Sequence, residues 1–241
     1  MAKALLQIQE LSKYYGKECI FSEVNFDLYE GEILGLAGRS GSGKTTLLQT
    51  IAGLEVISSG EILLRISEHE YTSLQGKYFS KTNLFGYSFQ QASFYPELTV
   101  MENIFYFARM HGLDRDEIIA KAGEVLKTLE LEHHIKAYAK NLSEGMKRRL
   151  DFACALMHEP KVLFLDEPTA ELDIFLREEL LKIIKKLSAK NIAIIFISHS
   201  LEEIKNICTR SLILHNTKVS IVKGTQVEEA LRQTIKNGKS N

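Results

Sequence analysis

The stretch that decides the fold is residues 32–54, EILGLAGRSGSGKTTLLQTIAGL. After its first residue the segment is apolar up to Gly38, which predicts a buried β-strand over 32–38. A loop of glycine and serine follows, and residues 44–54 then carry leucine and isoleucine at helical spacing. A strand, a glycine-rich loop and a helix in this order, with the spacing G-x-x-x-x-G-K-[ST], identify a P-loop. We therefore predict an α/β domain with a phosphate-binding loop at 38–46.

The residues of this loop have the chemistry that a polyphosphate requires. Glycines allow successive backbone N–H groups to turn toward one anion, and the start of the helix adds the positive end of its dipole. Lys44 would reach the β- and γ-phosphates, and the Thr45 hydroxyl would bind Mg²⁺. The predicted nucleotide-binding residues of the loop are Gly38, Arg39, Ser40, Gly41, Ser42, Gly43, Lys44, Thr45 and Thr46. The loop predicts binding of a nucleoside triphosphate with Mg²⁺, but not the process that its energy drives.

A second chemical site follows the strand predicted in VLFLDEPT, residues 162–169. Asp166 at the end of this strand would hold Mg²⁺ through a water molecule. Glu167 comes next, and its carboxylate can accept a proton from a water that attacks the γ-phosphate. An Asp-Glu pair is usually no more than two surface acids, but here it ends an apolar strand in a chain that has a P-loop. The pair therefore predicts hydrolysis.

Apolar runs elsewhere place the P-loop in a larger sheet. KVLFLDEP at 161–168 and NIAIIFISHS at 191–200 are apolar on both faces, as strands of a parallel sheet between two layers of helices are. Residues 172–189 carry one apolar stripe and predict a helix with a solvated charged face. Residues 97–157 contain three helical patterns without a strand, so we expect a helical subdomain inserted into the α/β core. No element is predicted for the polar residues 64–83, and the final NGKSN is expected to fray.

Composition and charge exclude several classes of protein. The formal net charge of the 241 residues is −1, so no nucleic-acid partner is expected. Cys19, Cys154 and Cys208 are widely separated and odd in number, which fits free thiols in a reducing compartment. No apolar run approaches the ~20 residues that span a bilayer, and the N-terminus has no signal-peptide pattern. We expect that any role at a membrane requires another polypeptide.

Residues 141–150, NLSEGMKRRL, predict the start of one further helix. Ser143 would be its N-cap, and Glu144 would lie in the first turn near the positive end of the helix dipole. We expect the three basic residues of KRR, 147–149, to face water.

Further motifs occur in the order found in the ATPase subunits of ATP-binding cassette (ABC) transporters, and the chain resembles that family over about residues 5–225. The family positions are occupied by Tyr15 (with Tyr14 as the alternative) for adenine stacking, Gln90 in the Q-loop, Ser143 and Gly145 in the signature, Asp173 in the D-loop and His199 in the switch. Each motif alone is weak, and a lone histidine after a strand more often has a packing role. Their common order makes a chance match negligible.

The resemblance implies a role for each of these residues. Glu167, His199, Gln90 and Lys44 would be catalytic, with His199 in contact with the γ-phosphate. Thr45, Gln90 and Asp166 would hold Mg²⁺, and ATP and Mg²⁺ would be the cofactors. Two such domains would dimerise head to tail as a homodimer or a heterodimer. Ser143, Gly145 and Asp173 of one would then close over the ATP on the P-loop of the other.

The resemblance also implies the fold, the partners and the location. The fold would be that of a P-loop NTPase, with a mostly parallel sheet, an N-terminal antiparallel β-subdomain and an inserted helical subdomain. Within a single domain, 1–241, residues 1–90 and 158–225 would form the catalytic core. Residues 91–157 would form the helical subdomain, and 226–241 the C-terminal helix and tail. The partners would be transmembrane permease subunits, which place the chain on the cytoplasmic face of a membrane.

The signature departs from the family pattern LSGGQ, because this chain has LSEGM. Met146 replaces the glutamine, which weakens one polar contact. Glu144 is the larger change, since a carboxylate close to a triphosphate is repelled at low dielectric. It could point to solvent, pair with a base across the dimer interface, or weaken the site.

Two other segments indicate the direction of transport. ELTVMENIFYFARMHGL at 97–113 and GMKRRL at 145–150 resemble exporters of the drug-resistance and ABC-2 type. The alternatives are an importer or lipoprotein-release ATPase, or a soluble ABC ATPase of iron–sulfur cluster assembly. With 42 residues after His199, we expect no regulatory domain of the kind that importers often carry at the C-terminus.

Overall fold

The computed structural model describes residues 3–68, 70–74, 84–91 and 93–237. Its central sheet has six strands, in the order β10 (Lys218–Lys223), β9 (Arg210–His215), β3 (Ile33–Gly38), β8 (Ala193–Ile197), β7 (Val162–Asp166) and β6 (Phe85–Ser88). Neighbouring strands from β9 to β6 are parallel, and β10 is antiparallel to β9. The predicted α/β class with a mostly parallel sheet is confirmed.

Both faces of this sheet are buried, as the apolar runs predict. All five residues of β7 and all five of β8 are buried. Because side chains alternate across a strand, Leu163 and Leu165 enter one hydrophobic core while Val162 and Phe164 enter the other. The sheet therefore separates two cores.

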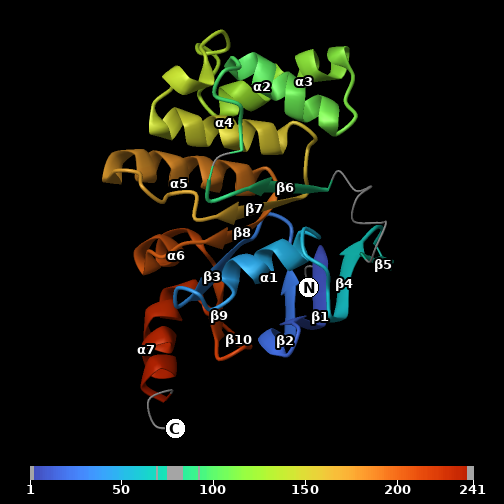
Figure 1. Ribbon diagram of the computed structural model, residues 1–241, viewed down its shortest axis with the longest axis vertical. Helices are drawn as coiled ribbons and strands as arrows, with labels where there is room; N and C mark the ends of the chain where they lie inside the picture. Colours follow the sequence, from blue (N-terminus) through green and yellow to red (C-terminus); the bar gives the residue numbers. More distant parts are fainter. Residues whose placement is uncertain (1–2, 69, 75–83, 92, 238–241) are drawn as a thin grey trace.

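Helices gather at the β6 end of the sheet (Figure 1). They are α2 (Val100–Met110), α3 (Arg115–Thr128) and α4 (Glu144–Leu156), and α4 contacts both β6 and α5 (Ile174–Ala189). Capping boxes fix the starts of two of them, from Thr99 with Glu102 and from Asp114 with Glu117. A short 3₁₀ helix, Ala139–Asn141, precedes α4. The three helices predicted within 97–157 are all present.

A second, antiparallel sheet packs with α1 (Lys44–Ile51) against one face of the central sheet. Its strand order is β2 (Glu18–Leu28), β1 (Leu6–Tyr15), β4 (Ser59–Arg65) and β5 (Tyr71–Ser73). The stretch 64–83, for which the sequence predicts no element, thus includes the end of β4 and all of β5. Residues 69 and 75–83 of that stretch lie outside the described residues.

The chain ends with α6 (Leu201–Ile207), a 3₁₀ helix (Gly224–Gln226) and α7 (Val227–Asn237). Apart from Asn237, the NGKSN tail that is predicted to fray lies outside the described residues. The helix predicted at 172–189 is α5, and of its apolar stripe Leu180, Ile183 and Leu187 are buried. Within the described ranges, no helix combines the length and apolar character needed to cross a membrane.

Candidate functional site

The P-loop lies between β3 and α1, where the sequence predicts it. Gly41 and Gly43 have φ angles of 75° and 97°, which glycine adopts without strain. A Cβ on Gly43 would lie 2.6 Å from Ile20 Cγ2, so this position also has no room for a side chain. Since α1 begins at Lys44, the unpaired N–H groups of its first turn adjoin the loop. The backbone therefore forms a cradle for an anion.

Two side chains of the loop are suited to a phosphate. Lys44 is buried, and its Nζ donates to the carbonyl oxygens of Gly38 at 3.2 Å and Arg39 at 3.0 Å. Burial lowers the pKa of Lys44, and the nearby charges of Glu167 and Asp166 act in the opposite direction. The hydroxyl of Ser42 is buried without a hydrogen-bond partner among the described residues. A buried hydroxyl without a partner is costly, so the loop fits a polyphosphate that would complete it.

An oxygen cluster suited to a divalent cation lies at the end of β7. Thr45 Oγ1 donates to Asp166 Oδ1 at 3.3 Å, and the hydroxyl of Tyr87 donates to Oδ2 at 3.4 Å. Asp166 is buried, and burial raises the pKa of its carboxyl. Burial and the Asp166 charge raise the pKa of Tyr87 in turn. Hydroxyl and carboxylate oxygens are the ligands that Mg²⁺ prefers, so Thr45 and Asp166 fit this ion. No motif in the sequence indicates Tyr87.

Glu167 is the centre of the predicted catalytic group. Its Oε1 lies 2.6 Å from Nε2 of His199, and Gln90 Nε2 donates to its Oε2 at 3.5 Å. Its backbone has φ 51°, an uncommon conformation for a non-glycine residue, and its N–H donates to Ile197 O at 3.1 Å. The structure therefore brings together the predicted catalytic residues Glu167, His199 and Gln90.

The topology explains why these residues meet. Gln90 follows β6, Glu167 follows β7 and His199 follows β8, while Lys44 follows the loop after β3. These four strands are parallel neighbours, so their carboxyl ends lie along one edge of the sheet. In an open α/β sheet that edge is the usual place for a ligand.

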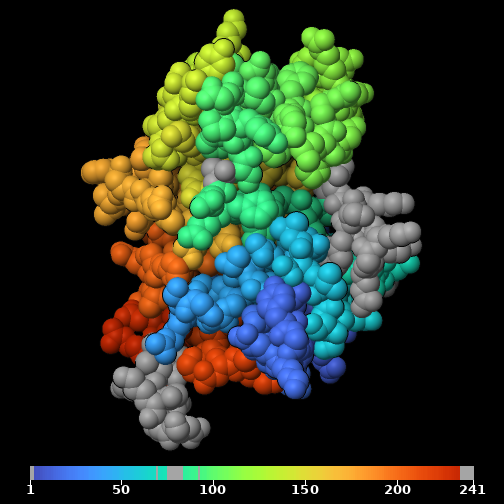
Figure 2. Space-filling view, viewed as in Figure 1, coloured from blue at the N-terminus to red at the C-terminus, as the bar shows by residue number. Residues whose placement is uncertain are grey.

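The two candidate tyrosines have different surroundings on β1. The ring of Tyr15 lies 4.7 Å from Lys13 Nζ, which in turn forms an ion pair at 2.8 Å with Glu55 beyond α1. The hydroxyl of Tyr14 instead bonds to Cys19, and this bond raises the pKa of Tyr14. The hairpin of β1 and β2 adjoins the P-loop region on one exposed face of the molecule, blue beside light blue in Figure 2. Half of the Tyr15 side chain is exposed, as a stacking residue requires.

The residues predicted to act on a second molecule's nucleotide lie apart from this cluster. Ser143 is the N-cap of α4, and its hydroxyl accepts from Met146 N at 3.3 Å. Asp173 caps α5 through Phe175 N and Leu176 N. Within the described ranges, no hydrogen bond or ion pair joins Ser143, Gly145 or Asp173 to the P-loop. The buried side chains of α4 and α1 lie in different cores, on opposite faces of the sheet.

Gly145, in the first turn of α4, faces Leu176 of α5. A Cβ at this position would lie 2.9 Å from Leu176 Cδ2, so α4 approaches α5 closely here. A larger residue at this position would require the end of the Leu176 side chain to move.

Glu144 points away from the body of the protein, since its side chain is 69% exposed. It pairs with Lys147 of its own helix at 2.6 Å. The expectation that the KRR residues all face water is wrong for two of them. Arg149 is 11% exposed and pairs with Glu130 and Glu179, and Arg148 donates to Phe89 O at 3.0 Å.

Glu203 of α6 is a buried acid beside the catalytic group, and no motif in the sequence predicts its role. Its Oε2 accepts from Thr169 Oγ1 at 2.8 Å and from Ser198 Oγ at 2.5 Å. Its Oε1 lies 3.2 Å from Arg177 Nε. Thr169 follows Glu167 by two residues, and Ser198 precedes His199. The Glu203 carboxylate thus links the loop that carries Glu167 to the loop that carries His199. Its position four residues after His199 was the available signal.

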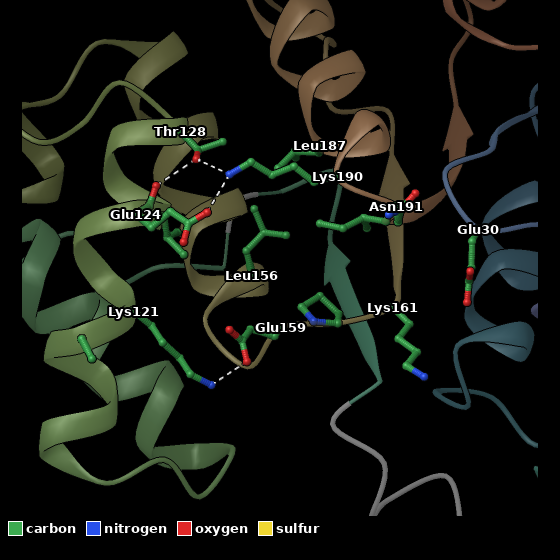
Figure 3. Close-up of a pocket in the computed structure, with 14 residues that line it drawn as sticks. Glu30, Lys121, Glu124, Thr128, Leu156, Glu159, Lys161, Leu187, Lys190 and Asn191 are labelled. Carbon is green, nitrogen blue, oxygen red and sulfur yellow. Dashed lines mark hydrogen bonds and ion pairs between the residues drawn. The ribbon is translucent and has the colours of Figure 1, made fainter. Parts of the chain in front are cut away.

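A cavity of about 620 Å³ lies elsewhere, between α3, the end of α4 and the end of α5 (Figure 3). Its charged groups are largely paired with one another, Lys121 with Glu159 at 2.7 Å and Lys190 with Glu124 at 2.9 Å. None of the predicted site residues lines it. The cavity therefore offers no alternative location for the phosphate chemistry.

Comparisons with known proteins agree with this geometry. Residues 21–170 match the family model described as ABC transporter. The linearmycin resistance ATP-binding protein LnrL of Bacillus subtilis (strain 168) is 34% identical over 225 residues, which are 93% of this chain and 70% of that protein. The methionine import ATP-binding protein MetN of Clostridium tetani is 33% identical over 218 residues, 90% of this chain and 68% of that protein. Among solved structures, cbiO1 from Clostridium perfringens, described as part of the ABC transporter complex cbiONQ, superposes with a TM-score of 0.82 at 28% identity, covering 97% of this chain and 94% of that one.

Proposed function

The chain belongs to the ABC transporter family as an ATP-binding subunit that hydrolyses ATP to drive transport, and we propose the following division of work among its residues. The observation that carries the proposal is the convergence of Gln90, Glu167 and His199 at the sheet edge that also holds the P-loop. The carboxyl ends of these strands thus bring together, within one chain, a loop that can bind an anion, a site for a cation and a carboxylate that can act as a base.

Nucleotide binding is assigned to the P-loop and to β1. The backbone N–H groups of residues 38–46 and the Lys44 ammonium hold the phosphates, and Tyr15 stacks on the adenine. Thr45, Asp166 and Gln90 hold Mg²⁺, which neutralises the charge of the phosphates when it is bound. The cluster of hydroxyl and carboxylate oxygens around Asp166 supports this assignment.

The hydrolytic step is assigned to Glu167. Its carboxylate accepts a proton from the attacking water, the water oxygen bonds to the γ-phosphorus, and the bond to the β–γ bridging oxygen breaks to leave ADP. Both carboxylate oxygens of Glu167 have partners, in His199 and Gln90. An oxygen of the γ-phosphate competes for the N–H of His199, which frees Glu167 to orient the water. Binding of the substrate thereby switches on the base.

A second ATPase domain completes each site. Ser143 and Gly145 at the start of α4, together with Asp173, approach the γ-phosphate held by the P-loop of the other domain. The exposed N-cap of α4 supports this role, because the first turn of a helix carries N–H groups without partners inside the helix. The second domain is another copy of this chain or a related one. We retain the division into a core (1–90 and 158–225), a helical subdomain (91–157) and a C-terminal part (226–241).

The membrane-spanning partner is a permease that holds this chain on the cytoplasmic face of the membrane. An exposed apolar surface around α2, formed by Tyr95, Tyr106 and Met110, supports such a contact. Tyr95 follows Gln90 by five residues, so a partner bound there contacts the chain shortly after Gln90. Export is the proposed direction, supported by the segment GMKRRL and by the similarity to a resistance protein. Import is the second candidate, because MetN is 33% identical.

Co-purification with a membrane protein tests the partner and the activity together. We expect the tagged chain to be recovered from solubilised membranes with a protein of many spans, and the complex to hydrolyse ATP only with Mg²⁺. The Lys44→Ala variant should co-purify equally but lose ATP binding. Recovery of the active chain without any membrane protein would contradict the proposed partner. In inside-out vesicles, uptake of the substrate on addition of ATP supports export, and its release supports import.

A further inference from the structure

One face of α4 holds the chain around Gln90. Arg148 Nη1 donates to the carbonyl oxygen of Phe89 at 3.0 Å, and its Nη2 donates to the carbonyl oxygen of Gln90. A guanidinium presents its N–H groups in a fixed fork, so these two bonds set the direction of the backbone as well as its distance. The main chain of Gln90 is therefore attached to α4.

Asp151 continues the same face one turn later. Its carboxylate accepts from the Ser88 hydroxyl and, at 2.9 Å, from the backbone N–H of Ser93. Residues three apart on a helix point in similar directions, so Arg148 and Asp151 act on the same stretch of chain. Together the two side chains bind the chain at Ser88 and Phe89, at Gln90 itself and at Ser93.

A buried carboxylate lowers the stability of a fold unless hydrogen bonds compensate for the loss of water. Asp151 is only 3% exposed, and burial raises the pKa of its carboxyl. An apolar residue would fill the core between α4 and β6 without that cost. Both of its oxygens bind groups on either side of Gln90, and the Gln90 side chain reaches Glu167. The placement indicates control of the Gln90 loop.

The same helix begins with the signature residues. Ser143 is the N-cap of α4, and Arg148 follows it by five residues, or roughly 7–8 Å along a helix that rises 1.5 Å per residue. An α-helix over this distance is rigid, so any displacement of the signature also displaces the anchor of Gln90.

We propose that Arg148 and Asp151 are positioning residues that fasten Gln90 to the signature helix, so that Gln90 reaches Glu167 and the nucleotide only where α4 is correctly placed. This inference rests on the proposed function, because it assigns Gln90 to the hydrolytic site. It goes beyond that function by naming the contacts through which the placement of α4 controls hydrolysis in the same chain.

A double-mutant cycle with Gln90→Ala provides the test. We expect Arg148→Ala and Asp151→Ala each to lower kcat by roughly 10- to 100-fold, as small misplacements of a reacting group do. The affinity for the fluorescent analogue TNP-ATP should stay within twofold, because neither residue contacts the P-loop. In the Gln90→Ala background, Arg148→Ala should lower kcat no further, since it acts through Gln90.

Conservative and control variants separate positioning from folding. Asp151→Asn retains an oxygen for Ser93 N–H and an amide that donates to the Ser88 hydroxyl, so we expect kcat within about threefold of the parent. Arg149→Ala removes a neighbouring arginine that pairs with Glu130 and Glu179 instead, and it should keep the parent kcat. If Asp151→Ala does not fold, the cycle with Arg148→Ala carries the test.

The outcomes distinguish this inference from the proposed function. If Gln90→Ala hydrolyses ATP at the parent rate, the assigned role of Gln90 is wrong, and the proposed function fails at that residue. If Gln90→Ala is impaired but Arg148→Ala and Asp151→Ala keep the parent kcat, only the inference about α4 is overturned. Multiplicative effects of Gln90→Ala and Arg148→Ala would also overturn it, because Arg148 would then act elsewhere.

Discussion

Nε2 of His199 lies 2.6 Å from Oε1 of Glu167, so the proposed base is bonded to the histidine that is proposed to bind the γ-phosphate. The two side chains follow the ends of the adjacent parallel strands β7 and β8, and the Glu167 N–H donates to Ile197 O of β8 at 3.1 Å. In the proposed mechanism, an oxygen of the γ-phosphate takes the place of the Glu167 carboxylate as the partner of His199. The mechanism therefore links the orientation of the attacking water to binding of the γ-phosphate.

Replacement of the histidine tests this pair. We expect His199→Ala to lower ATP turnover by roughly 100-fold, because the residue that holds the γ-phosphate and releases Glu167 is lost. Binding of TNP-ATP should remain within a few-fold, since the P-loop is untouched. Steady-state kinetics and fluorescence titration measure the two quantities. A His133→Ala variant, at an exposed histidine, is the control, and an unchanged turnover in His199→Ala would exclude the proposed role.

The signature acid should have little effect on hydrolysis. Because Glu144 is 69% exposed and pairs with Lys147 of its own helix, we expect Glu144→Gly to leave ATP turnover within a few-fold of the parent. Glu144→Ala separates the loss of charge from the flexibility that glycine adds to the first turn. A large rise in turnover in both variants would show that this acid restrains the site.

The buried carboxylate of Glu203 should matter for both stability and turnover. Glu203→Ala leaves Thr169 and Ser198 without their acceptor and Arg177 without its charge partner, which we expect to cost about 3 kcal/mol of unfolding free energy. Turnover of the folded variant should fall by roughly tenfold, because the loops of Glu167 and His199 lose their common anchor.

Denaturant titration and steady-state assays measure these two effects. The neighbouring Glu202 is exposed, so Glu202→Ala is the matched control and should change neither quantity. If Glu203→Ala has the stability and turnover of the parent, Glu203 does not anchor the loops of Glu167 and His199.

A pair of histidines should make the fold sensitive to acid. His158 is buried, stacks at 3.7 Å between ring centroids on His111, and has Nε2 2.9 Å from Phe85 O. Burial lowers the pKa of His158 to about 4 and also lowers that of His111. Between pH 6.5 and 4 the unfolded chain therefore binds more protons, and the stability that is complete above pH 6.5 is lost as the pH falls.

The measurement is the unfolding free energy at pH 7.5 and at pH 4.5. In His158→Gln, which can still donate to Phe85 O, the loss between these values should be smaller by about 2 kcal/mol than in the parent. Burial raises the pKa of Asp151 and Asp166, which changes the unfolding free energy with pH in the opposite direction. This contribution is the same in the parent and in His158→Gln, so it cancels in the difference between them. His133→Gln should behave like the parent, and an equal acid loss in His158→Gln would contradict the assignment.

The parts of the fold that the sequence predicts correctly are those with a strong local pattern. The strands β3, β7 and β8 are buried on both faces, and a strand in that environment is apolar along nearly all of its length. The P-loop combines such a strand with a helix start and a fixed glycine spacing. By contrast, β5 has only three residues, all half-buried, and the polar stretch around it gives no periodic signal.

The residues that support the site from behind are not visible in the sequence. Gln90 and His199 were predicted through a family resemblance and Glu167 from its place at the end of an apolar strand, and the structure brings the three together. Arg148 lies in a basic run that usually faces water, and Glu203 lies in a short helix whose acids are expected at its surface. Arg148 binds backbone oxygens 58 and 59 residues away, and Glu203 binds Thr169, which is 34 residues away, so only the fold identifies these contacts.

ATP turnover and ATP-dependent association of Glu167→Gln test the central claim most directly. The variant keeps the shape of the side chain but cannot accept the proton of the attacking water. We predict parent-like binding of TNP-ATP, a turnover lower by at least roughly 100-fold, and a dimer that persists in Mg²⁺–ATP during size-exclusion chromatography. Glu178→Gln, at an exposed position of α5, is the control. Turnover of Glu167→Gln at the parent rate would contradict the account, because the base would then be another group.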